Sequence, residues 1–201
     1  MKYIEGYFWP DDDVNCHPAV LSEVSNLERV YPYVKEFNTV VQAGGNCGVW
    51  PNVLSGKFKS VYTFEPDAMN FRCLNVNCQS DNVIKFQAVL GDKAHLVSLE
   101  TEKQNVGAHF VKGEGIIPTM RIDDLGLASC DLIYLDIEGM ELFALMGSIE
   151  TIKKFHPVIG IEDKSICCDR FGVEVGQTEK WLEQFGYKVV ARYARDVLLA
   201  C

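Results

Sequence analysis

The sequence predicts an α/β fold, with a mostly parallel seven-stranded sheet, helices on both faces and a C-terminal antiparallel hairpin. Short apolar runs alternate with segments of helical spacing along residues 39–201, and such alternation favours a parallel sheet covered on both sides. One run, residues 131–137, is almost continuously apolar, as is typical of a strand buried on both faces. The last two runs are separated by a very short turn, which indicates the hairpin.

The predicted elements follow one another in order along the chain. The expected strands are residues 39–43, 60–64, 83–89, 131–137, 157–162, 187–193 and 196–200. The expected helices are residues 49–56, 67–78, 141–155 and 178–185. The last of them is closed by Gly186, because glycine adopts the left-handed conformation that often ends a helix.

Two regions depart from this alternation. Residues 1–38 are aromatic and acidic, and we expect an N-terminal cap segment there, irregular apart from one helix near residues 19–30. Residues 91–118 hold two short apolar runs, at 96–99 and 108–111, that we expect to be short strands around a polar link. Both regions lie where loops could close over a site at the edge of the sheet.

The composition limits the classes of function. A chain of 201 residues has room for one sizeable domain, which we place at residues 39–201. Its formal charge of −9 disfavours nucleic acid as a partner. No apolar stretch approaches the length of a membrane span and Glu5 is an early acid, so we expect a cytoplasmic protein without membrane contact. The eight cysteines lack zinc-like pairing, which favours reduced thiols packed as small apolar groups.

A glycine-rich turn follows the first predicted strand. Gly44, Gly45 and Gly48 allow the backbone to turn sharply and to approach a ligand closely. Glu65 ends the second predicted strand, and a carboxylate at this separation suits the two hydroxyls of a ribose. The pair predicts a site for a nucleoside-containing cofactor.

Three motifs resemble those of FkbM-type methyltransferases: residues 42–48 (QAGGNCG), 64–66 (FEP) and 136–141 (DIEGME). Weaker matches lie at Asn105-x-Gly107, at residues 122–125 and at residues 157–162, so the resemblance extends over about residues 39–163. It implies a single Rossmann-like domain of the class I methyltransferase fold that uses S-adenosylmethionine. It also implies methylation of a hydroxyl group, and we expect the acceptor to be a small molecule or a glycan.

The resemblance and the predicted strand ends place the cofactor and the reacting groups at one edge of the sheet. Ligands gather beyond the carboxyl ends of parallel strands, where the strand order reverses. Glu65 and Pro66 are expected at the ribose, and Gln87 and Ala88 beside the adenine. The expected cofactor-binding residues are Gln42, Gly44, Asn46, Gly48, Glu65, Pro66, Gln87, Ala88 and Asp136.

One position departs from the family pattern. The family usually has an acid where this chain has Gln42, and that acid helps to hold the amino group of the cofactor's methionine. An amide still accepts a hydrogen bond but lacks the charge that attracts an ammonium group. Either Asp136 therefore holds this group, or the cofactor binds weakly.

Four residues are candidates for catalysis. Methyl transfer to oxygen requires an aligned acceptor and a group that takes the hydroxyl proton. Asp136, Glu138 and Glu162 are acids at predicted strand ends, and His109 is a candidate base shortly after Asn105-x-Gly107. Two facing acids could also hold Mg²⁺ together with water and substrate oxygens, but the spacing alone assigns no metal ligand.

Two other functions stay open. A NAD-dependent oxidoreductase shares the nucleotide-binding fold, but its first turn requires glycine where this chain has Ala43. The Tyr-x-x-x-Lys motif at residues 31–35 precedes the glycine turn, whereas short-chain reductases place it well after. The second alternative is a non-catalytic, cofactor-binding relic that serves as an interaction module, which Gln42 supports. The sequence predicts neither the individual acceptor nor the oligomeric state.

Overall fold

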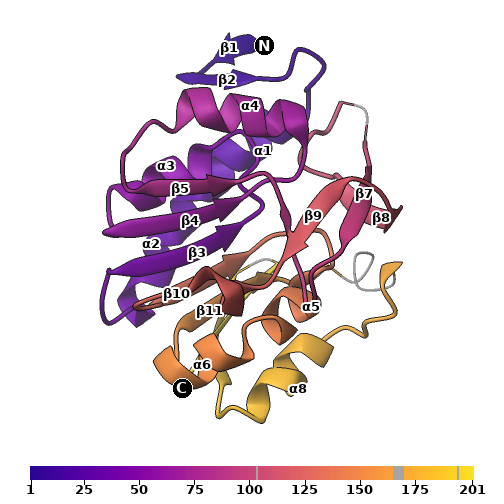
Figure 1. Cartoon of the computed structure of the whole chain (residues 1–201). Coiled ribbons are helices and arrows are strands. Elements are labelled where there is room, and N and C mark those ends of the chain that lie inside the picture. Colours follow the sequence, from indigo (N-terminus) through magenta and orange to yellow (C-terminus); the bar gives the residue numbers. More distant parts are fainter. Residues whose placement is uncertain (103, 165–169, 194) are drawn as a thin grey trace.

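A computed structural model describes residues 1–102, 104–164, 170–193 and 195–201 of the chain (Figure 1). Within these residues, seven strands form one sheet in the order β12-β13-β11-β10-β3-β4-β5. Their bounds are β3 (Thr39–Ala43), β4 (Ser60–Phe64), β5 (Val83–Phe86), β10 (Leu132–Leu135), β11 (Val158–Glu162), β12 (Lys188–Tyr193) and β13 (Asp196–Ala200). The predicted α/β fold class is confirmed.

The sheet is parallel except at β13. Strand β3 pairs in parallel with β4 on one side and with β10 on the other, and β5 and β11 continue the parallel pairing outward. Strand β13 runs antiparallel to both β11 and β12, which confirms the predicted hairpin. The chain moves from β3 outward to β5 and then returns to β10 on the other side of β3. Loops diverge at such a reversal, so a crevice opens at the carboxyl ends of β3 and β10.

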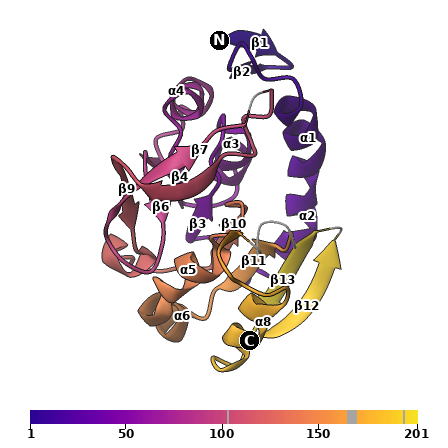
Figure 2. The same cartoon turned by 90° about the vertical axis from the view of Figure 1, so that its right-hand side faces the viewer.

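Helices cover both faces of the sheet, as expected. The helices described are α1 (Cys16–Glu23), α2 (Leu27–Val30), α3 (Val49–Ser55), α4 (Ala68–Asn77), α5 (Glu141–Met146), α6 (Ile149–Phe155) and α8 (Gln177–Glu183). Figure 2 shows α1, α2 and α3 on one side of the sheet and α5, α6 and α8 on the other. The sheet is therefore the central layer of three.

Successive residues of the central strands supply the two cores. Side chains alternate between the faces of a strand, so neighbours such as Val40 and Val41 point to opposite sides. Val40 and Leu132 pack in the cluster that contains Leu54 of α3, while Val41 and Ile133 pack with α5, α6 and α8. Strands buried on both faces carry the continuous apolar runs that predicted them.

The predicted strand at residues 83–89 is broken. Strand β5 ends at Phe86, and β6 (Val89–Leu90) belongs to a second sheet of order β6-β9-β7-β8 within the described residues. This sheet contains β7 (Leu96–Glu100), β8 (Phe110–Glu114) and β9 (Ile117–Met120). Strands near 96–99 and 108–111 were expected, whereas β9 was not.

The predicted helix at residues 141–155 is two helices, α5 and α6. They separate at Gly147, where an added Cβ would lie 2.0 Å from the carbonyl oxygen of Gly91. Asp123 then caps α6, because its carboxylate accepts hydrogen bonds from the backbone of Glu150 (3.1 Å) and Thr151 (2.9 Å). The close approach of Gly147 to Gly91 and the cap from Asp123 therefore divide the predicted helix in two.

The N-terminal segment is more regular than expected. It begins with a hairpin of β1 (Lys2–Ile4) and β2 (Tyr7–Trp9), and α1 starts at Cys16. The expected helix near residues 19–30 is α1 and α2, joined by a 3₁₀ turn at Val24–Asn26. Trp9 and Cys16 pack in a third core with Cys47, Cys73 and Val106, so this segment contacts both the glycine turn and the loop at Val106.

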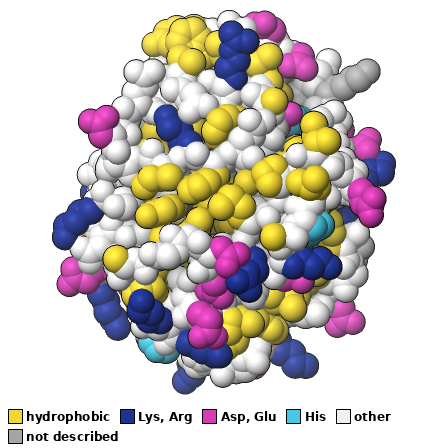
Figure 3. Space-filling model, viewed as in Figure 1, with side chains coloured by type: hydrophobic (Ala, Val, Ile, Leu, Met, Phe, Trp, Pro, Cys, Tyr) yellow, Lys and Arg dark blue, Asp and Glu magenta, His cyan; other side chains and the backbone are white. Residues whose placement is uncertain are grey.

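Hydrophobic side chains form a band across the face of the molecule seen in Figure 3. On β4 and β5, Tyr62 and Phe86 are only partly buried and stack with ring centroids 6.4 Å apart. Ile84 is 38% exposed. The helices on this side pack over β10 and β11, which leaves the β4–β5 end of the sheet less covered.

The cysteines of the described residues carry free thiols, and all of them except Cys201 are buried. Cys167 and Cys168 lie outside the described residues. In the part of the chain that the structure covers, no helix has both the length and the hydrophobicity needed to span a bilayer.

Candidate functional site

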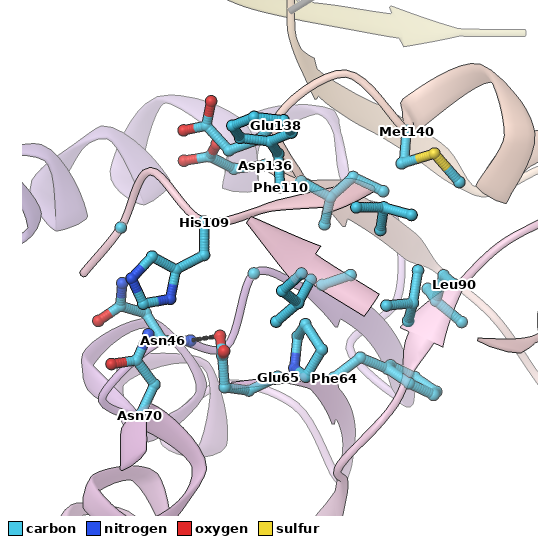
Figure 4. Close-up of a pocket in the computed structure, with 18 of the residues that line it drawn as sticks. Asn46, Phe64, Glu65, Asn70, Leu90, His109, Phe110, Asp136, Glu138 and Met140 are labelled. Carbon is cyan, nitrogen blue, oxygen red and sulfur yellow. Dashed lines mark hydrogen bonds between the residues drawn. The ribbon is translucent and has the colours of Figure 1, made fainter. Parts of the chain in front are cut away.

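A pocket opens at the carboxyl ends of β3, β4 and β10, where the strand order reverses (Figure 4). Its empty space is about 790 Å³, open solvent at the mouth included. The predicted residues that line it are Gly44, Asn46, Glu65, Pro66, Ala88, His109, Asp136 and Glu138. Gln42, Gly48, Gln87 and Glu162 do not line it. The structure therefore brings most of the predicted site together.

Gly44 allows the turn after β3 to pass very close to the end of β10. Its φ of +83° is in the left-handed region, and a Cβ at this position would lie 2.0 Å from the carbonyl oxygen of Asp136. The amides of Gly44 and Gly45 donate to the carbonyl of Phe64, at 3.1 and 2.8 Å. The glycine turn is thus fixed between the ends of two neighbouring strands.

Glu65 is a buried carboxylate at the base of the pocket. Its Oε2 accepts from the amide of Asn46 at 2.8 Å, and its Oε1 accepts from the amide of Asp67 at 2.8 Å. Only 5% of the residue is exposed, and this burial raises the pKa of the carboxyl to about 7. The side chain of Asn70 also hydrogen-bonds this carboxylate, and the lone-pair capacity that remains can accept from a ligand.

Gln42 lies below the turn and not in the pocket. It is 2% exposed, and its amide nitrogen donates to the carbonyls of Ala43 (3.1 Å) and Gly44 (3.0 Å). Its oxygen accepts from the hydroxyl of Thr63 at 2.6 Å. These bonds use both amide hydrogens, so Gln42 stabilises the turn from inside the protein.

Two other residues predicted to bind the cofactor, Gly48 and Gln87, also lie outside the pocket lining. Gly48 has a φ of +92° and precedes α3, where an added Cβ would lie 3.0 Å from the Cα of Leu74. Gln87 is exposed in the link between β5 and β6. Ala88, the next residue, is buried and lines the pocket.

An acidic cluster lies at the ends of β10 and β11. One oxygen from each of Asp136, Glu138 and Glu162 lies within 4.8 Å of the others. The ammonium of Lys164 contacts Glu162 at 2.5 Å and Glu138 at 3.1 Å, and Arg170 lies 3.7 Å from Glu138. Desolvation and the neighbouring carboxylate of Glu162 raise the pKa of Asp136 well above its usual value.

These three carboxylates have the ligand type that Mg²⁺ prefers. However, Lys164 already supplies a positive charge between Glu138 and Glu162. Its ammonium competes with a metal ion for the same oxygens, and we therefore assign no metal to the cluster.

His109 belongs to the segment that crosses the pocket before β8. It lines the pocket, and its side chain is 11% exposed. In Figure 4 the ring is turned toward the side with Asn46 and Asn70, away from Asp136 and Glu138. The residue thus lies at the site, and its role as a catalytic base stays a prediction.

Several lining residues were not singled out from the sequence. Asn70 is 1% exposed, and its amide donates to the carbonyl of Val106 at 2.7 Å. A buried asparagine inside a helix requires such a partner, which is a weak signal of a tertiary role. Phe110, Met140 and Leu90 form an apolar wall that no pattern distinguishes from ordinary core.

A family model described as the methyltransferase FkbM domain matches residues 42–189 of the chain. None of the curated proteins compared with the chain matches it.

Solved structures with the same fold are methyltransferases or related enzymes. A methyltransferase FkbM from Methylobacillus flagellatus KT is 19% identical, with a TM-score of 0.53, over 81% of this chain and 42% of its own. The chain thus spans less than half the length of that protein. A precorrin 8w decarboxylase from Methanobacterium thermoautotrophicum is 13% identical, with a TM-score of 0.54, over 96% and 99% of the two chains. A ribosomal protein L11 methylase from Lactobacillus delbrueckii is 11% identical, with a TM-score of 0.54, over 95% and 82%.

The family model covers most of the chain, and it includes the glycine turn, Glu65 and the acids after β10. The solved structures agree with the fold at low sequence identity. The chain therefore belongs to the FkbM methyltransferase family, whose members depend on S-adenosylmethionine.

Proposed function

We propose that the protein is an S-adenosylmethionine-dependent O-methyltransferase that acts on a hydroxyl group of a small molecule or glycan. The observation that carries this proposal is Glu65, a buried carboxylate oriented by two backbone amides beside a glycine turn. A buried carboxylate with spare lone pairs is costly unless a ligand uses it. Ribose hydroxyls are donors of the right kind.

The residues of the pocket fit the cofactor in its three parts. Glu65 would hold the ribose, and Pro66 and Ala88 would contact the adenine from the ends of β4 and β5. Gly44 and Asn46 would lie at the methionine end, where small or polar groups allow close contact. When bound, S-adenosylmethionine supplies a methyl group that an oxygen nucleophile can accept.

The acids at the pocket mouth are suited to proton transfer. Asp136 and Glu138 both line the pocket, and the raised pKa of Asp136 makes it a stronger base than an ordinary carboxylate. Glu162 lies behind them and interacts through Lys164. We infer that Asp136 takes the hydroxyl proton and that Glu138 helps to orient the acceptor.

Calorimetric titration tests the cofactor assignment without knowledge of the acceptor. We expect the protein to bind S-adenosylmethionine and S-adenosylhomocysteine but not NAD. Glu65→Ala should lose at least about tenfold in affinity, because hydrogen bonding of the ligand to a charged group is removed. Glu183→Ala, an exposed carboxylate on α8, is the matched control and should bind like the original protein.

Binding of NAD alone would overturn the proposal in favour of an oxidoreductase. Screening hydroxyl-containing sugars and metabolites with labelled methyl donor then identifies the acceptor. Cofactor binding without transfer to any acceptor class, and with no change on substitution of Asp136, would favour the non-catalytic relic.

A further inference from the structure

His109 is located where the protein closes over the nucleoside side of the pocket. It lies in the segment at residues 104–109 that leads into β8, so it is attached to the small sheet and not to the acids of β10. Its nearest charged partner is Asp67, just after Glu65, with 3.7 Å between Nδ1 and Oδ2. The ring therefore belongs to the same end of the pocket as Glu65.

The Nδ1 atom of His109 is buried without a hydrogen-bond partner. Asp67 uses its other oxygen, Oδ1, to cap α4 by accepting from the amides of Met69 and Asn70, each at 2.9 Å. The oxygen that faces His109 is thus available to the imidazole, and a small approach would make the bond. With Nδ1 directed to Asp67, the other ring nitrogen, Nε2, is left for a ligand.

The backbone around His109 is fixed by neighbouring elements. The carbonyl of Val106 accepts from Asn70 at 2.7 Å, and its amide donates to Asp13 at 3.4 Å. A Cβ on Gly107 would lie 2.9 Å from the Sγ of Cys16 and 3.5 Å from the amide nitrogen of Asn46. Because this loop packs directly against the glycine turn, His109 is held over the pocket.

We propose that His109 is a cofactor-binding residue. Asp67 orients its imidazole through Nδ1, and Nε2 accepts a hydrogen bond from the nucleoside. This rests on the proposed use of S-adenosylmethionine. Glu65 and His109 then approach the nucleoside from opposite sides, one from β4 and one from the loop before β8. The residue is not the base that takes the acceptor's proton.

Three substitutions of His109 separate this role from packing. Glutamine can place a polar group near the position of Nε2, asparagine near that of Nδ1, and leucine keeps only bulk. Calorimetry with S-adenosylhomocysteine should give a loss of about threefold to tenfold in affinity for His109→Leu and His109→Asn, the contribution of one hydrogen bond. His109→Gln should retain most of the affinity.

A second ligand and a control locate the contact. 5′-Methylthioadenosine lacks the amino-acid tail. The affinity of His109→Leu and His109→Asn for it should fall by the same factor, since the contact is to the nucleoside. His95→Leu changes an exposed histidine and should bind both ligands normally. Asp67→Ser keeps a helix cap but removes the carboxylate, and it should weaken binding less than His109→Leu does.

The outcomes separate this inference from the cofactor assignment. If the unaltered protein binds neither ligand, the proposed function fails. The inference is wrong if the unaltered protein binds both ligands and His109→Leu and His109→Asn bind them with the same affinity as the unaltered protein, at an unchanged melting temperature. A loss for the homocysteine compound alone would move the contact from the nucleoside to the tail and also overturn it.

Discussion

At the scale of single residues, the proposed ribose-binding role of Glu65 makes cofactor affinity depend on pH. Its pKa of about 7 lies above the ordinary 4.5, so a large fraction is protonated at pH 6 and loses an acceptor lone pair. We predict that affinity for S-adenosylhomocysteine rises by up to about tenfold between pH 6 and pH 8. Calorimetry across this range measures the effect.

Glu65→Gln is the control, since an amide does not titrate in this range. Its affinity should be lower and should stay flat where that of the original protein rises. The effect of pH on the stability of the ligand-free protein has the opposite sign to its effect on affinity. A raised pKa in the folded state means that the ligand-free protein loses stability as the pH rises from 4.5 through 7. A pH-independent affinity of the original protein would contradict the assignment of Glu65.

Gly44 should tolerate no side chain. Gly44→Ala places a Cβ 2.0 Å from a backbone oxygen of Asp136, so the ends of β3 and β10 must separate. We predict a loss of roughly 3 kcal/mol in the free energy of unfolding, together with loss of cofactor binding. Gly113 is the matched control: its φ is +64° but nothing lies within 4 Å of an added Cβ. Gly113→Ala should lose only about 1–2 kcal/mol and bind normally. Equal losses in urea denaturation would contradict this account.

The sequence predicted this site best where backbone geometry or a buried charge requires one residue type. Gly44 and Glu65 are such positions. Gln42 was placed in the pocket because it occupies the motif position whose acid helps to hold the cofactor in the family, but its amide turns inward to Thr63 and two carbonyls. A side chain near the end of a strand can point either to the ligand or to the core. The sequence does not determine which.

At the scale of elements, the ends of β10 and β11 bring three carboxylates around Lys164, with Arg170 3.7 Å from Glu138 and Arg195 3.9 Å from Glu162. Lys164 lies between Glu138 and Glu162, and its side chain is 20% exposed. We predict that Lys164→Met lowers the free energy of unfolding by about 2 kcal/mol at pH 8, because the remaining carboxylates repel one another. The loss should be smaller at pH 5.5, because the raised pKa of Asp136 favours its protonation as the pH falls and so reduces the repulsion.

Urea denaturation at the two pH values measures this change. Lys153→Met is the control, because Lys153 forms an exposed pair with Glu150 at 3.2 Å and should contribute little. Mg²⁺ should raise the melting temperature of Lys164→Met but not that of the original protein. Equal stabilisation of both by Mg²⁺ would show that Lys164 does not exclude the metal.

The elements themselves were predicted well where periodicity and length agree. Strands β3, β4 and β13 have the expected bounds, since each is an apolar run between clear turn residues. The breaks between β5 and β6 and between α5 and α6 were missed. Both depend on distant parts of the chain: β6 pairs with β9, and Gly147 approaches Gly91. Such contacts are tertiary, and local pattern does not contain them.

At the scale of the whole molecule, Asp13 joins the N-terminal segment to the pocket. It is fully buried and accepts hydrogen bonds from the amides of Cys16 (3.1 Å), His17 (3.0 Å) and Val106 (3.4 Å). Burial alone would raise the pKa of Asp13, but these bonds and the His17 side chain hold it below its usual 3.8.

We predict that Asp13→Asn lowers the free energy of unfolding by about 1–2 kcal/mol at pH 7 and weakens binding of S-adenosylhomocysteine. Because the folded pKa is depressed, the carboxylate stabilises the fold above pH 3.8 and this contribution is lost as the pH falls below that value. Denaturation at pH 7 and pH 3 checks the sign. Asp11→Asn, at a carboxylate 78% exposed, is the control. A stability difference that grows in acid would contradict the prediction.

The whole architecture was predictable because alternating strands and helices allow few arrangements. The N-terminal hairpin was not, since three-residue strands such as β1 and β2 carry almost no periodicity. Nor could the sequence show that Trp9 and Val106, far apart in the chain, share one core with the glycine turn.

That shared core has a consequence for the rate of ligand exchange. The amides of Val14 and Asn15 both donate to the carbonyl of Gln104, at 3.0 and 2.9 Å, and so fasten the loop over the nucleoside end to the N-terminal segment. We predict that a ligand seated beneath that loop leaves only after these bonds open. We expect the cofactor to dissociate slowly in a first-order step. Loop opening should set the rate, so S-adenosylmethionine and S-adenosylhomocysteine should dissociate at similar rates.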